Sequence, residues 1–489
     1  MALIENIINA VNNFLWTYIL VVMLIGLGIY FTVKMKFMQI LYLKEIFHSI
    51  FEKAPKTKDG SNEISSMQAF FIGAATRIGT GNMAGVAIAL TIGGPGAIFW
   101  MWFAAVLGGA SAFVESTLAQ IYKVKTDEGF KGGPGYYIQK QSGLKWPSMI
   151  FAFTIILSFG LIFNAVQTNT ITSAFNYSFG LNPVLMGVFI TILTALIIFG
   201  GVKRIANFTQ IIVPIMSVFY ITLALYIIVT NISDVPAALA SIFKSAFGFE
   251  QIAGGGIGVA IMNGVKRGLF SNEAGMGSAP NAAATANVSH PVKQGFVQLL
   301  GVFFDTLIVC SCTAFIIMLS NVETSGELSG IEITQAAMTQ HFGSWASIFL
   351  AFAIFTFAFS SIVGGYYYGE ANLSFIHNSS LALLIYRIAV LIMIMFGAVA
   401  NLQIVWNLAD LSMAIMAVIN LIAIAFLGKF SFAALHDYMQ QRKLGLSPIF
   451  YASSIPGLKG VECWESDKQS AISTKHIEGE KNDELRILL

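Results

Sequence analysis

The chain has 489 residues, of which 56% are hydrophobic and 11% charged, with a mean hydropathy of +0.74. Soluble proteins carry about 25% charged residues, so this composition excludes an ordinary soluble domain and predicts an all-α protein that crosses a membrane many times. The net charge of +2 gives no sign of a nucleic-acid partner. Three cysteines are too few for a disulfide framework, and their spacing does not fit a metal site.

Hydrophobic runs of roughly 20 residues predict about 11 transmembrane helices. The N-terminus has neither the basic segment nor the small-residue cleavage site of a secretory signal, so the first run is expected to remain as an uncleaved helix. The helices are expected near 13–33, 66–91, 95–121, 148–175, 183–200, 206–230, 252–286, 294–320, 343–371, 380–399 and 404–427.

The connecting segments predict how the chain is oriented. If the segment 34–65 is cytoplasmic and the sides alternate, most of the 27 Lys and Arg residues fall in the cytoplasm, and Lys244 lies outside. Positive residues accumulate on the cytoplasmic side of membrane proteins, so the N-terminus is expected outside and the C-terminus inside. Residues 36–52 and 235–247 are expected to form short helices on the membrane surface, and the tail after Lys459 is expected to be flexible.

Two glycine-rich runs interrupt hydrophobic spans, at 76–85 (TRIGTGNMAG) and 272–280 (NEAGMGSAP). Glycine weakens a helix interior by about 0.5–1 kcal/mol, and unwound backbone survives at membrane depth only against protein or a watery cavity. We therefore predict that both runs are breaks in membrane helices, and that the breaks face each other around a transported solute. The alternative is glycine for close helix packing. A dinucleotide-binding loop is excluded because 97–105 holds no acidic residue.

The order of the spans predicts an inverted repeat. When the first span is set aside, ten remain, and a broken span opens each group of five. Because five is odd, the second group enters the membrane from the opposite side, which is typical of secondary transporters. The expected regions are 1–65 (an extra N-terminal transmembrane helix and a cytoplasmic amphipathic helix), 66–230 (first repeat), 231–427 (second repeat) and 428–489 (cytoplasmic tail).

The broken spans also carry specific motifs. The runs 79–82 (GTGN), 93–97 (GGPGA) and 270–280 (FSNEAGMGSAP) resemble the alanine or glycine:cation symporters, which are bacterial and archaeal sodium-coupled amino-acid carriers. The likeness covers nearly the whole chain before the tail. It implies the leucine-transporter-type fold, in which loosened main chain holds the amino acid.

The resemblance implies roles for two groups of residues. One group would bind the amino acid, with the first break near its carboxylate, an aromatic ring closing over it and the glycines of the second break near its amino group. The other group would bind sodium through first-helix carbonyls and hydroxyls of a later helix, an oxygen-only shell that suits a hard cation. The substrate-binding group is Gly79, Thr80, Asn82, Gln167, Phe270, Gly275 and Gly277, and the sodium group is Ala75, Ile78, Phe357, Ser360 and Ser361.

One position departs from the family pattern. Relatives often have Gly-Trp where this chain has Gly364 and Gly365. If the Trp closes the side-chain end of the pocket, Gly365 leaves room for a longer side chain, so Gly365 is counted with the substrate-binding residues and glutamine is expected as a substrate beside alanine and glycine. The alternative is that Tyr366 or Phe355 fills the gap and specificity is unchanged.

Charged residues within spans are costly, by about 2.5–3.5 kcal/mol on insertion scales, and usually pair or face water. Arg77 and Glu273 lie in the two breaks and are expected near the axis that relates the repeats, paired directly or through water. Alternatively, each binds backbone carbonyls of its own break. Glu115, Asp305 and Asp410 could join a proton path or could be satisfied structural partners.

These observations favour a sodium-coupled secondary symporter that imports a small neutral amino acid by alternating access, with Na⁺ as the co-transported ion. A proton-coupled symporter or exchanger is the alternative. A channel is less favoured because midplane breaks do not make a continuous pore, and an enzyme is not expected because the chain lacks catalytic motifs. We expect a multi-pass protein of a prokaryotic plasma membrane that functions as a monomer, with the amino acid and the lipid bilayer as its partners.

Overall fold

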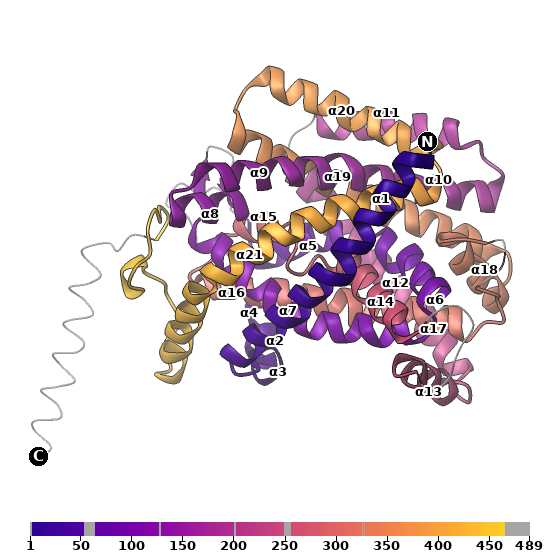
Figure 1. Ribbon diagram of the computed structural model, residues 1–489, viewed down its shortest axis with the longest axis horizontal. Coiled ribbons are helices and arrows are strands. Elements are labelled where there is room, and N and C mark those ends of the chain that lie inside the picture. The colour runs from indigo at the N-terminus through magenta and orange to yellow at the C-terminus, as the bar shows by residue number, and fades with distance from the viewer. Residues whose placement is uncertain are drawn as a thin grey trace, which may run out of the picture.

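The computed structural model describes residues 2–52, 64–126, 129–199, 202–248, 256–324, 326 and 328–464. These residues form a bundle of helices with one short ribbon, in which β1 (Val124–Thr126) pairs antiparallel with β2 (Gly129–Lys131) (Figure 1). The all-α class is as predicted. Residues 53–63 and the tail beyond 464 lie outside the described residues, and so do the predictions made for them.

Among the described residues, seven helices are long and apolar enough to cross a membrane, or up to eight if one bent pair is a single span. The predicted number of 11 is not confirmed, although helices occupy every range in which a span was predicted. The seven are Asn6–Lys34, Gly96–Ile121, Lys145–Phe179, Pro291–Met318, Trp345–Ile376, Ser380–Val399 and Leu402–Lys443.

Three of these long helices contain a π-helical stretch between two α-helical parts, and such wide turns frequently occur at functional sites. The other four are continuous or nearly so: α7 (Gly96–Ile121), α19 (Trp345–Ile376), α20 (Ser380–Val399) and α21 (Leu402–Lys443). The three composite helices are α1 (Ala2–Phe14), η1 (Leu15–Leu20) and α2 (Val21–Lys34); α9 (Lys145–Ile155), η3 (Ile156–Ile162) and α10 (Phe163–Phe179); and α16 (Pro291–Phe303), η4 (Phe304–Cys310) and α17 (Ser311–Met318).

The remaining predicted spans are covered by shorter, broken or bent helices. α11 (Pro183–Ile198) has 16 residues. α12 (Val202–Thr230) contains Pro214, and its second part meets α13 (Val235–Ala246) at an angle of 103°. The short helix predicted at 235–247 is therefore present as α13.

The predicted amphipathic segment 36–52 forms α3 (Met38–Leu41) and α4 (Leu43–Ile50). Ion pairs at the ends of the bundle join this segment to α16 and α21, with Lys293 Nζ 2.5 Å from Glu52 and Arg442 2.6 Å from Glu45. The other short elements are α8 (Pro134–Ser142), α18 (Ile331–Phe342) and η5 (Ala452–Ser454).

The first predicted break lies between α5 (Ser66–Arg77) and the helix formed by η2 (Gly81–Gly85) and α6 (Val86–Gly93). Ser65 and Gln68 form a capping box that starts α5. Ile78 then adopts an extended conformation, with φ −77° and ψ 100°, which ends the helix in the buried interior of the bundle.

The second predicted break lies between α14 (Ile257–Asn272) and α15 (Ala279–Ala284). Glu273 adopts left-handed backbone angles, and Gly275 and Gly277 follow with φ of +81° and +83°. Glycine adopts such angles without steric cost, so this sequence unwinds where an ordinary helix would continue.

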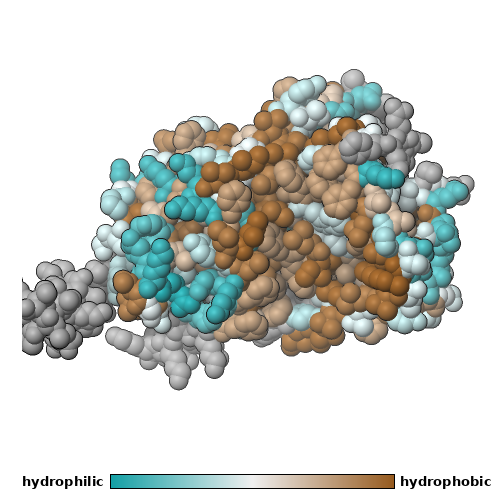
Figure 2. All heavy atoms as spheres, turned by 90° about the horizontal axis from the view of Figure 1, so that it is seen from below, coloured by the Kyte–Doolittle hydropathy of each residue, from teal (hydrophilic) through white to brown (hydrophobic). Residues whose placement is uncertain are grey.

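The outer surface is apolar over a large area, as expected for a protein that contacts lipid. Large exposed side chains such as Tyr18, Leu196 and Phe426 lie on helices at the periphery of the bundle. Figure 2 shows apolar residues across the middle of one face, with polar residues gathered towards both ends. Polar contacts between helices therefore lie mainly in the buried interior of the bundle.

Candidate functional site

The first break brings four of the predicted substrate-binding residues together. Thr80 donates to Oε1 of Gln167 from both its hydroxyl, at 2.7 Å, and its backbone N–H, at 3.2 Å. The Gly79 N–H donates to Oδ1 of Asn82 at 2.9 Å. Thr80 and Asn82 are fully buried, and Gln167 on α10 is almost fully buried. The unwound backbone is therefore held by polar side chains at membrane depth.

Glycine is needed at position 79 because two other helices approach the break closely. A Cβ on Gly79 would lie 2.6 Å from Oγ of Ser361 on α19 and 3.0 Å from Oε1 of Gln167 on α10. A larger residue would displace one of these two side chains from its contacts at the break. The break is thus packed on both sides by residues that the resemblance places in the site.

The predicted sodium residues lie beside the same break. The Ser360 and Ser361 hydroxyls both donate to the carbonyl of Ala75, at 3.2 and 2.9 Å, and to that of Phe357, at 2.8 and 3.0 Å. Ile78, the fifth residue, directly precedes Gly79. Because hydroxyl and carbonyl oxygens are ligands that a hard cation prefers, the residues present fit a sodium ion carried as a substrate.

Phe270 lies where the two breaks meet. Its ring stacks on Phe163 of α10, with centroids 4.6 Å apart, and lies 4.5 Å from the ring of Trp406 on α21. A Cβ on Gly81 would lie 3.1 Å from Phe270 and 2.9 Å from the Cα of Ser271. The interrupted helices therefore touch directly. Trp406 was not singled out from the sequence, where it is one aromatic residue in an apolar span.

The second break is held by a residue that the sequence interpretation left without a firm role. The Glu115 carboxylate on α7 accepts from the N–H of Gly275 and the N–H of Gly277, both at 3.1 Å, and from Nδ2 of Asn420 at 2.7 Å. Asn420 also donates to the Gly275 carbonyl at 2.9 Å. The polar groups of this break are thus bound within the protein, away from the Thr80–Gln167 contact.

Gly365 has an environment different from the one proposed for it. A Cβ at this position would lie 2.8 Å from the Phe159 carbonyl oxygen and 3.0 Å from Oδ1 of Asn164. Gly365 therefore lies at a close crossing of α19 with η3, and the space beside its Cα is occupied in this structure. Tyr366, proposed as a filler, instead packs against Tyr386 with centroids 5.4 Å apart and accepts a hydrogen bond from Arg387.

Arg77 and Glu273 do not form the direct pair that was considered. Arg77 donates to Oε1 of Gln298 on α16 at 2.9 Å, and Glu273 accepts from the Ser278 hydroxyl of its own break at 2.6 Å. Both residues are buried. The alternative was that each residue binds backbone carbonyls of its own break. Glu273 is bound within its own break, but its partner there is a hydroxyl and not a backbone carbonyl.

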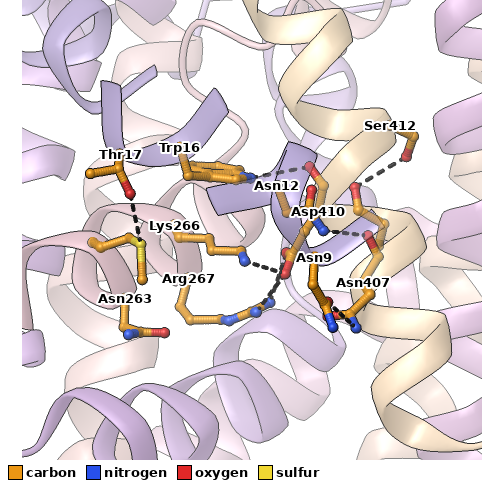
Figure 3. A network of polar contacts seen from close by, with 12 residues as sticks. Asn9, Asn12, Trp16, Thr17, Asn263, Lys266, Arg267, Asn407, Asp410 and Ser412 are labelled. Atoms are coloured by element: carbon orange, nitrogen blue, oxygen red, sulfur yellow. Dashed lines mark hydrogen bonds and ion pairs between the residues drawn. The ribbon is translucent and has the colours of Figure 1, made fainter. Parts of the chain in front are cut away.

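A buried ion cluster links α14 to α21 and to the N-terminal helix (Figure 3). Asp410 lies 2.5 Å from Lys266 and 2.8 Å from Arg267, and its backbone carbonyl accepts from Nε1 of Trp16 at 3.2 Å. Arg267 also lies over the ring of Trp406, 4.5 Å from its centroid. The cluster therefore connects, through Trp406, to the ring of Phe270. Asp410 is therefore a structural partner of Lys266 and Arg267, which is one of the two roles considered for it from the sequence.

A bundle with two interrupted helices that meet at a buried polar site is typical of a secondary transporter. The chain belongs to the sodium:alanine symporter family, whose model matches residues 1–452. This membership identifies a transporter and not an enzyme.

Curated relatives and solved structures agree with this class. The chain is 55% identical to the amino-acid carrier protein AlsT of Bacillus subtilis, over 96% of this chain and 99% of the relative, and 51% identical to the probable sodium/glutamine symporter GlnT of the same organism, over 97% and 99%. It is 40% identical to the sodium/alanine symporter AgcS of Methanococcus maripaludis, over 86% and 94%. A crystal structure of a mutant of the Eremococcus coleocola manganese transporter matches with a TM-score of 0.51 at 12% identity, over 87% of both chains, which indicates a shared fold.

Proposed function

We propose that the protein carries a neutral amino acid into the cell together with sodium. Family membership supports sodium-coupled symport, and relatives that match 96% and 97% of this chain are named as an amino-acid carrier and a probable sodium/glutamine symporter. The observation that carries the proposal is the first break, where Thr80 and Gln167 meet beside the carbonyl of Ala75 and the hydroxyls of Ser360 and Ser361.

The amino acid binds at the first break, in contact with Gly79, Thr80 and Asn82, with Gln167 and Phe270 beside it. The helix Gly81–Gly93 starts at this break, and the N-terminal end of a helix favours a carboxylate. The main chain of Gly275 and Gly277 is bound by Glu115 and Asn420. We therefore assign these two glycines to the shape of the second break and not to contact with the amino group.

Sodium binds to the oxygens of Ala75, Ile78, Phe357, Ser360 and Ser361. The two hydroxyls already face the carbonyls of Ala75 and Phe357, so rotation of each O–H away from the site would leave oxygens directed at an ion. An ion there orders the end of α5, on which the amino acid binds. Sodium thereby raises the affinity for the amino acid, and by linkage the amino acid raises the affinity for sodium.

Transport requires movement, because the site is closed in this structure. Thr80, Asn82, Gln167 and Phe270 are all nearly or fully buried. We propose that the bundle with the two interrupted helices rocks between states that open to either side, as in a carrier of about 11 helices with a 5+5 inverted repeat. The proposed chain orientation in the plasma membrane places the N-terminus outside and the C-terminus in the cytoplasm, and one chain suffices for transport.

The amino acid that is carried and the ion that drives transport each have specific candidates. Glutamine and alanine are both named for relatives, so both belong in the panel of amino acids. Proton coupling is the second candidate for the driving ion, since relatives at 43% and 38% identity are named as sodium/proton-dependent alanine carriers.

The test is uptake of radiolabelled amino acids into proteoliposomes, with sodium and proton gradients applied separately. Accumulation of a neutral amino acid that requires inward sodium, and counterflow at equal sodium on both sides, is the expected result. Accumulation driven by a pH gradient alone would favour proton coupling. Protein that moves no amino acid under either gradient would contradict the proposal.

A further inference from the structure

A groove with basic walls lies where the last long helix leaves the bundle. It has a volume of about 420 Å³ and is bounded by α21, by α8 and by the C-terminal segment, which is residues 444–464. Figure 1 shows this segment, in yellow, turning back towards α8. Lys429 and Phe430 of α21 line one side of the groove, and Pro456 and Lys459 of the C-terminal segment line the other. None of the described residues that line it is acidic.

The groove adjoins the surface that faces lipid. On α21 an apolar stripe runs along Ile415, Ile422 and Phe426, whose side chains are 42, 47 and 75% exposed. Residues spaced by seven, four and three lie on one face of a helix, so the exposed Lys429 continues this stripe as its first charged residue. The exposed Trp146 lies in the first turn of α9, which packs against α8 and α21. Because tryptophan is enriched at the boundary between hydrocarbon and water, the groove lies at the level of the lipid headgroups.

The wall formed by the C-terminal segment is held in place by α8. The Gln141 side chain accepts from the Lys459 N–H at 3.0 Å and donates to the Gly457 carbonyl at 3.1 Å. Beside it, Lys140 forms an ion pair with Glu462. These contacts give the groove a defined shape and fix the main chain that carries Lys459.

The two lysines of the groove lack a negatively charged partner. Within the part of the chain that the structure describes, neither Lys429 nor Lys459 forms an ion pair. Glu462 is paired with Lys140, and Asp437 of α21 lies 3.1 Å from His290. Lys429 Nζ lies over the ring of Phe430, 5.1 Å from its centroid. Since like charges in one groove repel each other, an anion bound to both lysines would be stabilising.

We propose that this groove binds the headgroup of an anionic phospholipid. Lys429 and Lys459 bind its phosphate, and its acyl chains lie along Phe426 and Ile422. Lysine binds phosphate as a point charge, and basic pockets between helices at the cytoplasmic face are suited to anionic headgroups. A lipid is favoured over free phosphate because the groove continues into the apolar stripe of α21. The inference does not depend on which solute the protein carries.

The first experiment measures the Tm of the purified full-length protein in detergent micelles that contain increasing amounts of dioleoylphosphatidylglycerol. A ligand that binds the folded state raises Tm. We expect a saturable rise that phosphatidylcholine with the same acyl chains does not reproduce. In Lys429→Gln/Lys459→Gln, the amount of phosphatidylglycerol that gives half of the rise should increase about 30-fold, the combined effect of two lost lysine–headgroup contacts.

Lys44→Gln/Lys443→Gln is the matched control, because it removes the same charge from exposed lysines outside the groove. Lys443 lies 14 positions after Lys429, which is about 21 Å along the helix. The control is expected to respond to phosphatidylglycerol as the wild type does. An equal loss of response in the two double variants overturns the site, since the attraction would then belong to the basic surface as a whole. An equal rise of Tm with phosphatidylcholine also overturns it, since the acyl chains would then act alone.

Two further measurements identify the occupant. Inorganic phosphate is added at constant ionic strength in place of lipid, and a rise of Tm with phosphate but not with phosphatidylglycerol overturns the lipid as the ligand. Native mass spectrometry then counts the phosphatidylglycerol molecules that stay bound. We expect the wild type and the control to retain one more molecule than Lys429→Gln/Lys459→Gln, and equal numbers in all three proteins would contradict the proposal.

Discussion

Thr80 and Gln167 make the contact closest to the proposed amino-acid site. The Thr80 hydroxyl and amide share one acceptor, Oε1 of Gln167, so this side chain fixes the angle at which the main chain leaves the break. Position 167 lies in a largely apolar span, within a polar run that also holds Asn164, Thr168 and Asn169. The resemblance to the symporter family pointed to both residues. The hydrogen bond between them is visible only in the folded structure.

Thr80→Val tests this contact because valine keeps the shape and removes the hydroxyl. We expect the KM for the amino acid to rise about tenfold, the effect of one lost hydrogen bond to a binding site, with sodium dependence retained. Thr170→Val is the control, since the hydroxyl of Thr170 bonds the Val166 carbonyl of its own helix at 3.1 Å. Equal KM values in the two variants would contradict a role for Thr80 in binding.

Gly365 is the residue whose surroundings the sequence alone did not show. A missing tryptophan suggested an empty wall, but the neighbouring atoms are the main chain of Phe159 and the carboxamide of Asn164. A single sequence shows that a side chain is small and does not show whether a second helix fills the space beside it.

Gly365→Ala should consequently act on stability. Overpacking typically costs about 1–3 kcal/mol, so we expect a Tm several degrees lower, measured by thermal unfolding in detergent. Gly26→Ala is the matched control, because a Cβ there meets nothing within 4 Å and alanine favours the helix by about 0.5–1 kcal/mol. If Gly365→Ala kept its Tm and excluded glutamine while still carrying alanine, the pocket interpretation would be restored.

At the scale of the element, the two interruptions were predictable because their cause is local. Glycines and polar residues in an apolar span weaken the helix wherever the span packs. The contacts that stabilise each break come from residues that are distant in the sequence. Glu115 binds Gly275 and Gly277 across 160 and 162 positions of sequence, so the sequence showed an acid within a span without showing its partners.

Glu115→Gln tests whether this carboxylate shapes the second break. Glutamine keeps one acceptor oxygen and places an NH₂ group against an N–H donor, and each buried donor left without an acceptor costs about 1–3 kcal/mol. We expect a lower Tm and slower uptake. Glu332→Gln is the control, because Glu332 accepts from Ser173 and from the Ser329 N–H near the surface of the bundle. An unchanged Tm in Glu115→Gln would show that the break holds its shape without the carboxylate.

At the scale of the whole molecule, composition predicted an all-α membrane protein, and the long apolar helices of the described residues agree with it, whereas the 5+5 inverted repeat stays a prediction. The number of spans was harder to predict. Helices that bend, as α12 and α13 do between Thr230 and Val235, or that unwind at glycine present pieces too short to recognise as complete crossings. The extra N-terminal helix also has a structural role that hydropathy does not reveal, since Trp16 and Asn12 bond the backbone of α21 at Asp410 and Asn407.

The Asp410 cluster makes this arrangement testable. Asp410→Asn leaves Lys266 and Arg267 buried together without an anion, and breaking a buried ion pair in this way costs about 3–5 kcal/mol. We expect a large fall in Tm and loss of uptake, because α14, which ends in the second break, is no longer fixed to α21. Trp16→Phe removes only the indole N–H and should cost about 1 kcal/mol. If both variants unfolded at the same temperature, the N-terminal helix and not the ion cluster would be what holds α14 in place.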